Sequence, residues 1–310
     1  MKYASFKYDV VNTDLEDKLP ALGLANLGDN IQTLAAEQFI PSVDKKFHRD
    51  YLKYSANAEP YILIMNGWFS KSPHTSLPAH ESIKPVFIGF HISKSASTLK
   101  TFLKSEYIDY FRRFEPIGCR DKQTAEYLSS KGIQAFYSKC LTLTFPSRKE
   151  TPKDGKVFIV DASDIPIPNS LRKEACFVTH FCPDFYGDEI KTLMASKLLD
   201  YYRKKAKLVI TTRLHCAMPC LAMGIPVIFF GDPNSYRLSI LQDLGLKINQ
   251  LPSQSTKLAW KFYSKINKHN TEQTFLNGVN WNPPSLNIEQ EKQKLIKTTK
   301  ELLSKRLSSS

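Results

Sequence analysis

Arg213 and His215 are the residues of this chain whose types and spacing point most directly to chemistry. A guanidinium group stays positively charged and can hold a phosphate or a carboxylate through two parallel hydrogen bonds. An imidazole two residues further along can donate or accept a proton near neutral pH. Together the two side chains indicate a site that binds an anion and transfers a proton.

The sequence around this pair predicts the elements that position it. The apolar, β-branched run 208–212 predicts a buried strand, and 225–230 predicts another. Residues 214–223 have helical composition, and the Gly-Ile-Pro sequence that follows predicts the end of that helix. Because ligands bind beyond the carboxyl ends of parallel strands, where a helix N-terminus favours anions, we expect the pair to face a ligand.

Strands and helices alternate over most of the remaining chain, whereas the first 25 residues show no clean strand. This alternation is typical of an α/β protein with mostly parallel sheets. Further strands are predicted over 61–66, 85–90, 133–137, 157–160 and 175–179, and further helices over 98–114, 122–131, 188–205 and 235–244.

A chain of 310 residues exceeds the usual size of one domain, so two domains are expected. The polar segment 147–156 contains Pro and Gly and is the expected linker. We therefore predict an N-terminal domain over 1–148 and a C-terminal domain over 149–285. Residues 286–310 are expected to form a basic amphipathic helix that packs back on the body.

The composition of the chain indicates which kinds of partner and which cellular location to expect. The net charge of +13 favours an anionic substrate or an anionic membrane surface, and it also permits nucleic acid. No recognition motif or zinc-finger spacing supports nucleic acid, and no apolar run of about 18 residues predicts a membrane span. The six cysteines form no CxxC pair, which favours a reducing cytoplasm. Cys216 and Cys220 are four residues apart, and buried thiols are expected there rather than a metal site.

Other candidate residues follow predicted strands or precede predicted helices. Gly28 would allow close approach of a ligand just before a helix that Asp29 or Asn30 could cap. The alternative is a simple capped surface helix. His91 and His180 each end a predicted strand, where a histidine is more often a hydrogen-bonded structural residue than a functional one.

Four stretches carry a resemblance to a known family. Arg213-Leu214-His215, followed by a helix and Gly-Ile-Pro-Val-Ile, resembles a motif of the polysaccharide pyruvyl transferases. The Gly-Asp helix start within 26–35 is similar, as is the segment 117–121 with the later 138–144. Asn66-Gly-Trp with the later His91 is a looser match. The resemblance covers roughly residues 25–232.

The resemblance implies a fold and a reaction. The implied fold is GT-B-like, with two Rossmann-like domains whose mostly parallel sheets face a cleft. Characterised members move the enolpyruvyl group of phosphoenolpyruvate onto two hydroxyls of a sugar, giving a pyruvate ketal and phosphate. Phosphoenolpyruvate would be a co-substrate, and neither a cofactor nor a metal is expected.

The resemblance also assigns roles. His215 is expected to be the acid that protonates the methylene carbon of phosphoenolpyruvate, and His91 a second catalytic or phosphate-binding group. Arg120 could instead form a local ion pair with Asp121. The expected substrate-binding residues are Arg213, Leu214, Arg120, Gly28, Asp29, Asn66 and His180.

Two alternatives remain open at this stage. A GT-B glycosyltransferase that uses a nucleotide sugar would need the same basic cleft, and a family member could bind glycans without catalysis. The sequence leaves the acceptor sugar open. The basic tail favours a lipid-linked precursor, with peripheral contact at the inner face of the membrane.

Overall fold

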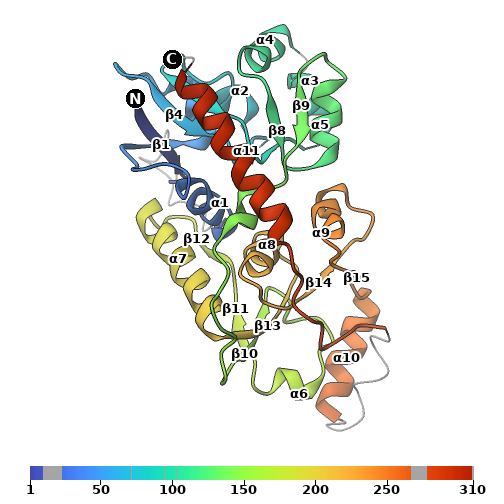
Figure 1. The fold of residues 1–310 in the computed structure, drawn as a ribbon. Helices are drawn as coiled ribbons and strands as arrows, with labels where there is room; N and C mark the ends of the chain where they lie inside the picture. The colour runs from blue at the N-terminus through green and yellow to red at the C-terminus, as the bar shows by residue number, and fades with distance from the viewer. Residues whose placement is uncertain (10–22, 71, 94, 103, 267–277, 309–310) are drawn as a thin grey trace. The chain divides into compact units, whose positions relative to one another are not determined.

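The computed structural model describes residues 1–9, 23–70, 72–93, 95–102, 104–266 and 278–308, and Figure 1 shows its elements in chain order. The chain is a mixed α/β protein with several mostly parallel sheets, as predicted. It divides into two compact units. Unit 1 comprises Met1–Phe145, Phe181–Ser196 and Glu289–Ser310, and unit 2 comprises Pro146–His180 and Lys197–Ile288.

Unit 1 contains two parallel four-stranded sheets and a small antiparallel pair of strands. The first sheet has the order β3-β1-β4-β6, the second the order β5-β7-β8-β9, and the pair is β12-β2. The bounds are β1 Lys2–Lys7, β2 Leu24–Asn26, β3 Lys45–His48, β4 Tyr61–Ile64, β5 Gly67–Trp68, β6 Ile83–Val86, β7 Phe90–His91, β8 Ile117–Cys119, β9 Ala135–Tyr137 and β12 Phe181–Pro183.

Strand β1 corrects the prediction that the first 25 residues hold no clean strand. It pairs with β3 on one side and β4 on the other, so it lies inside its sheet. Its sequence contains one large aliphatic or phenyl side chain, Phe6, while Ala4 and Ser5 are also buried. Burial of such small side chains depends on the neighbouring strands, which the local sequence does not show.

Two predicted strands differ from the structure. The predicted strand 61–66 ends at Ile64 as β4, and β5 follows it in another sheet. The predicted strand 85–90 is divided between β6 and β7, which also lie in different sheets. Gly89, between β6 and β7, has φ +68°, and a Cβ there would lie 2.0 Å from Asn66 Oδ1. A glycine permits both this left-handed conformation and the close approach.

The helices of unit 1 cover an aromatic core. Phe87, Phe90 and Phe111 pack edge to face, with ring centroids 5.1 and 5.5 Å apart. The predicted helix 98–114 is divided into two helices, α3 and α4. The helical segments are α1 Leu27–Glu37, η1 Arg49–Tyr54, α2 Pro73–Ser76, α3 Ala96–Phe102, α4 Ser105–Arg113, α5 Lys122–Ser129, η2 Leu141–Thr144 and α11 Glu289–Ser308.

Helix α11 contacts η2 and β6 within unit 1. Lys139 Nζ lies 2.6 Å from Glu291 Oε2, and Arg306 Nη2 donates to the Phe114 carbonyl at 3.0 Å. Leu295 and Leu303 are buried on the same helix. Within the described ranges, no helix is long and apolar enough to cross a membrane.

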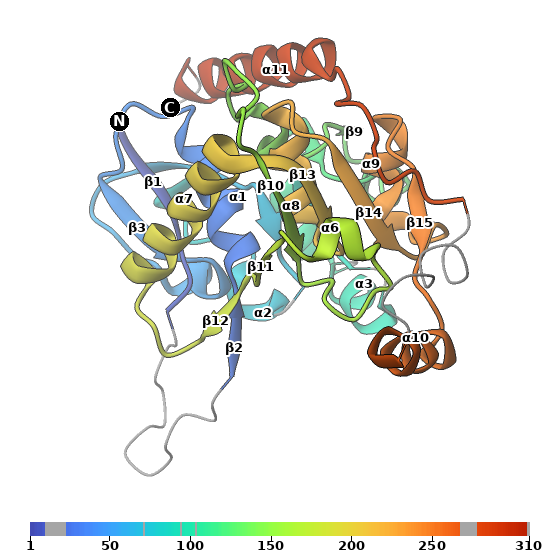
Figure 2. The ribbon, with the colours of Figure 1, turned by 90° about the horizontal axis from the view of Figure 1, so that it is seen from below.

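Unit 2 is built on one parallel five-stranded sheet of order β11-β10-β13-β14-β15. Figure 2 shows β10, β13 and β14 side by side. Both faces of the three central strands are buried, which explains their near-continuous apolar sequences. The strands are β10 Lys156–Val160, β11 Cys176–Val178, β13 Ala206–Thr211, β14 Val227–Gly231 and β15 Ile248–Gln250.

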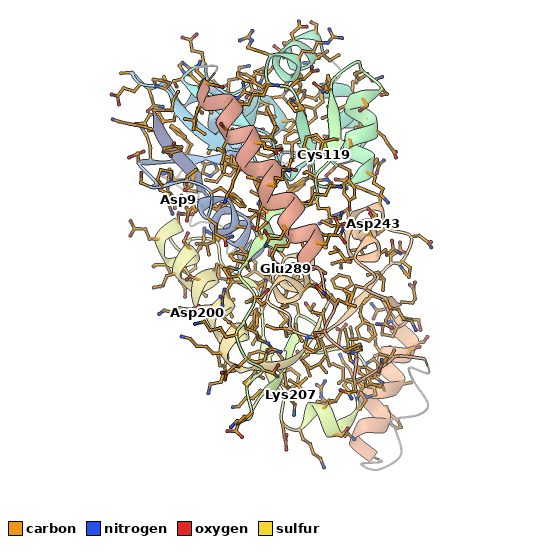
Figure 3. All side chains as sticks on the ribbon, in the orientation of Figure 1. Asp9, Cys119, Asp200, Lys207, Asp243 and Glu289 are labelled. Atoms are coloured by element: carbon orange, nitrogen blue, oxygen red, sulfur yellow. The ribbon has the colours of Figure 1, made fainter. Side chains whose placement is uncertain are left out.

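The remaining helical segments include the one predicted after Arg213. Helix α8 runs from Leu214 to Ala222, within one residue of the predicted 214–223. Helix α7 matches its predicted bounds, whereas the predicted helix 235–244 is divided into η3 and α9. The bounds are α6 Asn169–Arg172, α7 Asp188–Lys205, η3 Tyr236–Leu238, α9 Ser239–Asp243 and α10 Gln254–Ile266, and Figure 3 shows the side chains on these elements.

Candidate functional site

In unit 2, three neighbouring strands end in polar residues. Asp161 follows β10, His180 lies two residues after β11, and Arg213 lies two residues after β13. Since the sheet order is β11-β10-β13, Asp161 lies between the other two at the carboxyl edge of the sheet. The sheet topology therefore brings together residues separated by up to 52 positions.

Asp161 is the common partner of the other two residues. Its Oδ2 accepts a hydrogen bond from Arg213 Nε at 2.8 Å and another from the His180 backbone N–H at 3.0 Å. The Arg213 and Asp161 side chains are 26% and 12% exposed. Arg213 is thus a partly exposed cation that a more deeply placed carboxylate holds by Nε.

Helix α8 begins directly after Arg213, as the sequence predicts. Arg213 is its N-cap residue, Leu214 is its first helical residue and His215 its second. His215 is 9% exposed and Leu214 is 8% exposed. The local sequence thus places the cation and the imidazole on one turn, with Arg213 the more accessible of the two.

His180 is completely buried inside unit 2. Its Nε2 lies 2.9 Å from the Tyr202 hydroxyl, and the two rings stack with centroids 6.0 Å apart. Burial raises the pKa of the Cys216 thiol, but hydrogen bonds with Cys220 and His180 outweigh burial, so the net pKa lies below its usual value. His180 therefore contacts the interior beneath α8, and its predicted role in substrate binding stays a prediction.

All six cysteines are free, and both Cys216 and Cys220 are buried. In the part of the chain that the structure describes, no group of three or more His, Cys, Asp or Glu side chains could hold a metal ion. Both thiols lie in the packed interior around α8, as their complete burial shows.

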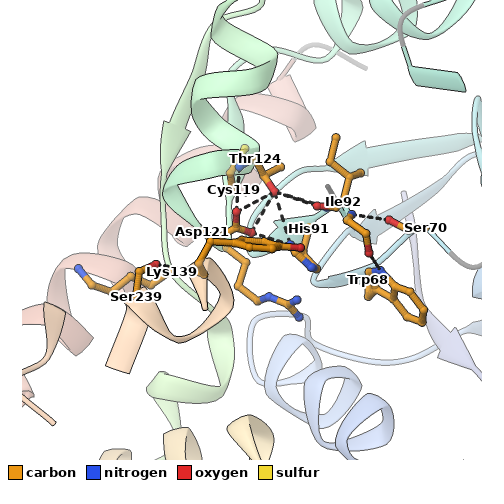
Figure 4. A network of polar contacts seen from close by, with 12 residues as sticks. Trp68, Ser70, His91, Ile92, Cys119, Asp121, Thr124, Lys139 and Ser239 are labelled. Carbon is orange, nitrogen blue, oxygen red and sulfur yellow. Dashed lines mark hydrogen bonds and ion pairs between the residues drawn. The ribbon is translucent and has the colours of Figure 1, made fainter. Parts of the chain in front are cut away.

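In unit 1, His91 and Asp121 form a buried pair. Strands β7 and β8 are neighbours with Phe90 opposite Cys119, so the residues that follow them also lie close together. His91 Nδ1 is 2.6 Å from Asp121 Oδ2, and both side chains are 2% exposed (Figure 4). An ionised carboxylate only accepts hydrogen bonds, so Nδ1 carries the hydrogen and donates it to Asp121.

Asp121 also caps helix α5. Its Oδ1 accepts a hydrogen bond from the Thr124 N–H at 2.8 Å, and the Thr124 hydroxyl lies 2.9 Å from Oδ2. Burial raises the pKa of Asp121. The hydrogen bonds from His91 and from the Thr124 N–H lower this pKa by more than burial raises it, so the net pKa lies below its usual value. The carboxylate is therefore held ionised, and it fixes the orientation of the His91 ring.

Arg120 connects the His91 region with helix α1. It is 3% exposed, and its Nη1 donates to Gln32 Oε1 at 3.3 Å. Gln32 Nε2 in turn donates to Asp29 Oδ1 at 3.1 Å. The charge of Arg120 also lowers the pKa of Asp121, so the arginine interacts with both Gln32 and Asp121.

Helix α1 starts earlier than the predicted cap. Its N-cap is Asn26, whose side chain accepts from the Gly28 N–H at 3.1 Å, so the prediction of Asp29 or Asn30 as the cap was wrong. Gly28, Asp29 and Asn30 thus lie inside the first turn of the helix. Gly28 is buried, whereas the Asp29 side chain is 24% exposed.

Asn66 is completely buried in the turn between β4 and β5. Its Nδ2 donates to the Gln32 carbonyl at 2.9 Å, and its Oδ1 accepts from the Leu141 N–H at 3.3 Å. These bonds tie α1 to η2. The structure shows a bridging role for Asn66, and its predicted contact with substrate stays a prediction.

Arg49 is a buried charged residue that was not predicted as part of a site. This residue begins η1, is 3% exposed, and contacts Asp50 at 2.9 Å and Asp29 at 3.5 Å. Burial lowers the pKa of Arg49, but the negative charges of Asp29 and Asp50 outweigh burial and raise that pKa above its usual value. The local sequence around Arg49, Lys45-Lys46-Phe47-His48-Arg49-Asp50, is mostly charged and does not single this residue out.

A family model described as polysaccharide pyruvyl transferase matches residues 26–235 of this chain. The chain belongs to this family. No curated protein matches the chain. Among solved structures, a functionally uncharacterised protein from Klebsiella pneumoniae is similar to 81% of this chain and 93% of its own, at 13% identity and a TM-score of 0.44.

The matched region of this pyruvyl transferase family member contains all the predicted site residues. Those in unit 1 are His91, Arg120, Gly28, Asp29 and Asn66, and those in unit 2 are His215, Arg213, Leu214 and His180. Within unit 1 the structure joins Arg120 to Asp29 through Gln32, and within unit 2 it joins Arg213 to His180 through Asp161. Family membership confirms the resemblance and implies a transferase.

Proposed function

We propose that the chain transfers the enolpyruvyl group of phosphoenolpyruvate to two hydroxyls of a sugar, releasing phosphate and forming a pyruvate ketal. The observation that carries the proposal is the Arg213-Leu214-His215 turn at the start of α8, inside the region matched by the family model. Its side chains provide a cation and an imidazole at the carboxyl edge of a parallel sheet.

The donor would bind through its two anionic groups. Phosphoenolpyruvate carries a phosphate and a carboxylate, and a guanidinium matches the planar geometry of either group. Arg213 is the predicted arginine with the most accessible side chain, at 26% exposed, while Arg120 is 3% exposed. We therefore assign Arg213 to the first contact with the donor, and Arg120 to the remaining anionic group.

The chemistry would require one acid and two entering hydroxyls. His215 protonates the methylene carbon, which leaves the neighbouring carbon electrophilic. One hydroxyl forms a C–O bond to that carbon, and the second forms another as the bond to the phosphate oxygen breaks. Of the two protons that the hydroxyls release, one restores His215 and the other leaves with phosphate, so the reaction balances.

His91 is proposed as the second catalytic or phosphate-binding group. Asp121 holds Nδ1–H, which orients the other ring nitrogen for proton exchange or for a phosphate oxygen. The arrangement resembles other carboxylate–histidine pairs, in which the carboxylate fixes tautomer and orientation. Because His91 is only 1% exposed, this role requires substrate to reach a buried ring.

The GT-B-like arrangement is part of the proposal. Two compact units that each contain parallel sheets support it, as does membership of the family. In such an arrangement, residues from the two Rossmann-like halves would act on one substrate. The acceptor would be a surface or exopolysaccharide precursor made in the cytoplasm, and a lipid-linked precursor would bring the enzyme to the inner face of the membrane.

Phosphate release tests the proposal. The chain would be incubated with phosphoenolpyruvate and a panel of sugar acceptors, with Arg213→Ala as the matched protein control. We expect acceptor-dependent release of phosphate by the wild type and a large loss in the variant. No release across the panel, together with turnover of a uridine or guanosine diphosphate sugar, would replace the proposal with a glycosyltransferase.

A further inference from the structure

Asp161 combines an unusual backbone conformation with four hydrogen-bonded neighbours. Its φ is +49°, in the left-handed region that side chains other than glycine adopt only at a cost. Aspartate and asparagine tolerate this region better than most residues do. A non-glycine residue held there beside a candidate site is an observation that points to function.

The neighbouring strands hold the main chain of Asp161 in this conformation. Its N–H donates to the Val178 carbonyl at 3.1 Å, on the side of β11. Its carbonyl accepts from the Thr212 hydroxyl at 2.9 Å, on the side of β13. The backbone is therefore fixed from both sides, and the direction of the side chain is fixed with it.

We propose that Asp161 is the positioning residue of the anion site: its carboxylate holds the Arg213 guanidinium at the angle that binds the anionic donor. The Oδ2–Nε bond of 2.8 Å fixes the plane of the guanidinium, which determines how its fork meets a phosphate or a carboxylate. The same oxygen accepts from the His180 N–H, so this oxygen is itself held in place. This inference rests on the proposed function for the identity of the donor.

Charge and geometry predict opposite effects when Asp161 is neutralised. A carboxylate beside the site repels an incoming anion, so Coulomb interactions alone predict tighter anion binding after the carboxylate is removed. Loss of the bond to Nε removes one restraint on the orientation of the Arg213 guanidinium, which predicts weaker binding. The sign of the change therefore distinguishes a positioning residue from a bystander charge.

Two variants separate the carboxylate from the backbone. Asp161→Asn keeps a residue that tolerates positive φ, and Asp161→Gly removes both the carboxylate and the steric cost of that φ. Asp164→Asn is the matched control, because Asp164 lies three residues away, pairs with Lys257 and has a 46% exposed side chain. It carries the same charge change without touching Arg213.

Isothermal titration with inorganic phosphate and with phosphoenolpyruvate gives the dissociation constants. We expect Asp161→Gly to raise both constants by about 10- to 100-fold, in line with the loss of a charge-assisted hydrogen bond, and Asp161→Asn to raise them less. Asp164→Asn should stay within about threefold of the wild type. In steady-state assays, KM for phosphoenolpyruvate should rise more than kcat falls.

The Arg213→Ala background completes the test, because a residue that acts through Arg213 has nothing left to position there. Adding Asp161→Gly to Arg213→Ala should not weaken phosphate binding further. Unchanged or tighter binding by Asp161→Gly in the wild-type background would overturn the inference, as would a wild type that binds neither anion. If the variants weaken phosphate binding as expected but no pyruvyl transfer occurs, the proposed function fails and the positioning role stands.

Discussion

Two carboxylate-anchored pairs, one in each unit, differ in how far they are buried. Asp121 follows β8 and holds His91, and both side chains are 2% exposed. Asp161 follows β10 and holds Arg213, whose side chain is 26% exposed. Breaking a buried pair is costly to the fold, whereas a partly exposed pair contributes little stability and keeps its cation within reach of a ligand. We therefore expect the buried pair to contribute chiefly to the stability of unit 1, and the partly exposed pair to keep Arg213 accessible to a ligand.

Replacing His215 by Ala should produce the largest effect, on turnover alone. Removing a general acid costs about 10²- to 10⁴-fold in kcat. The free energy of unfolding, measured with urea, should match that of the wild type to within about 1 kcal/mol, because alanine in the first turn of α8 still permits the helix. His74→Ala, at an exposed histidine of unit 1, should leave kcat unchanged. Unchanged turnover in His215→Ala would show that the acid is another residue.

Arg213→Ala should reduce kcat/KM for phosphoenolpyruvate by roughly 10²-fold while stability changes by less than about 1 kcal/mol. The exposed Arg237 of unit 2 gives the matched control, and Arg237→Ala should keep the wild-type kcat/KM. If Arg213→Ala lowered the midpoint of urea unfolding as much as breaking the buried His91–Asp121 pair does, the two pairs would not differ in their contribution to stability.

Asp121→Ala should lower the stability of unit 1. It removes both the partner of His91 and the N-cap of α5, which together cost about 3 kcal/mol in the free energy of unfolding. Urea denaturation measures this change, and Glu126→Ala, at an exposed position of the same helix, should change it by about 0.5 kcal/mol or less. An Asp121→Ala protein as stable as the wild type would show that the buried pair does not hold unit 1 together.

The smallest expected effect is a difference in acid sensitivity. The pKa of Asp121 is lower in the folded protein than in the unfolded chain, where it is about 3.9. The ionised carboxylate therefore contributes stability above pH ~4, and this contribution is lost as the pH falls through the folded pKa. Asp121→Asn should show a weaker decline in stability below pH ~4 than the wild type. Parallel declines would place the stabilising charge elsewhere.

The sequence predicted the strand, helix and strand around Arg213 and His215 well because this information is local. A β-branched run, a short helix and a Gly-Ile-Pro stop lie within 23 consecutive residues, and the structure places β13, α8 and β14 there. The pairing of Arg213 with Asp161 was not predictable, because it depends on β10 lying between β11 and β13. Strand order follows from packing of the whole sheet rather than from any local pattern.

Unit 1 was predicted less completely. Strand β1 was missed because its burial depends on β3 and β4. The contacts of Arg49 with Asp29 and of Arg120 with Gln32 join segments 20 or more residues apart, so the sequence showed single charged residues without their partners. The cap of α1 was placed three or four residues late because Asn26, Asp29 and Asn30 are all good capping residues.

Product analysis in deuterium oxide tests the central claim most directly. If His215 protonates the methylene carbon, a solvent deuteron enters there, and the ketal methyl group of the product carries one deuterium for each phosphate released. Nuclear magnetic resonance of the product from phosphoenolpyruvate and a sugar acceptor should show a CH₂D signal. Release of phosphate without a deuterated ketal methyl, or consumption of a nucleotide sugar in place of phosphoenolpyruvate, would contradict pyruvyl transfer.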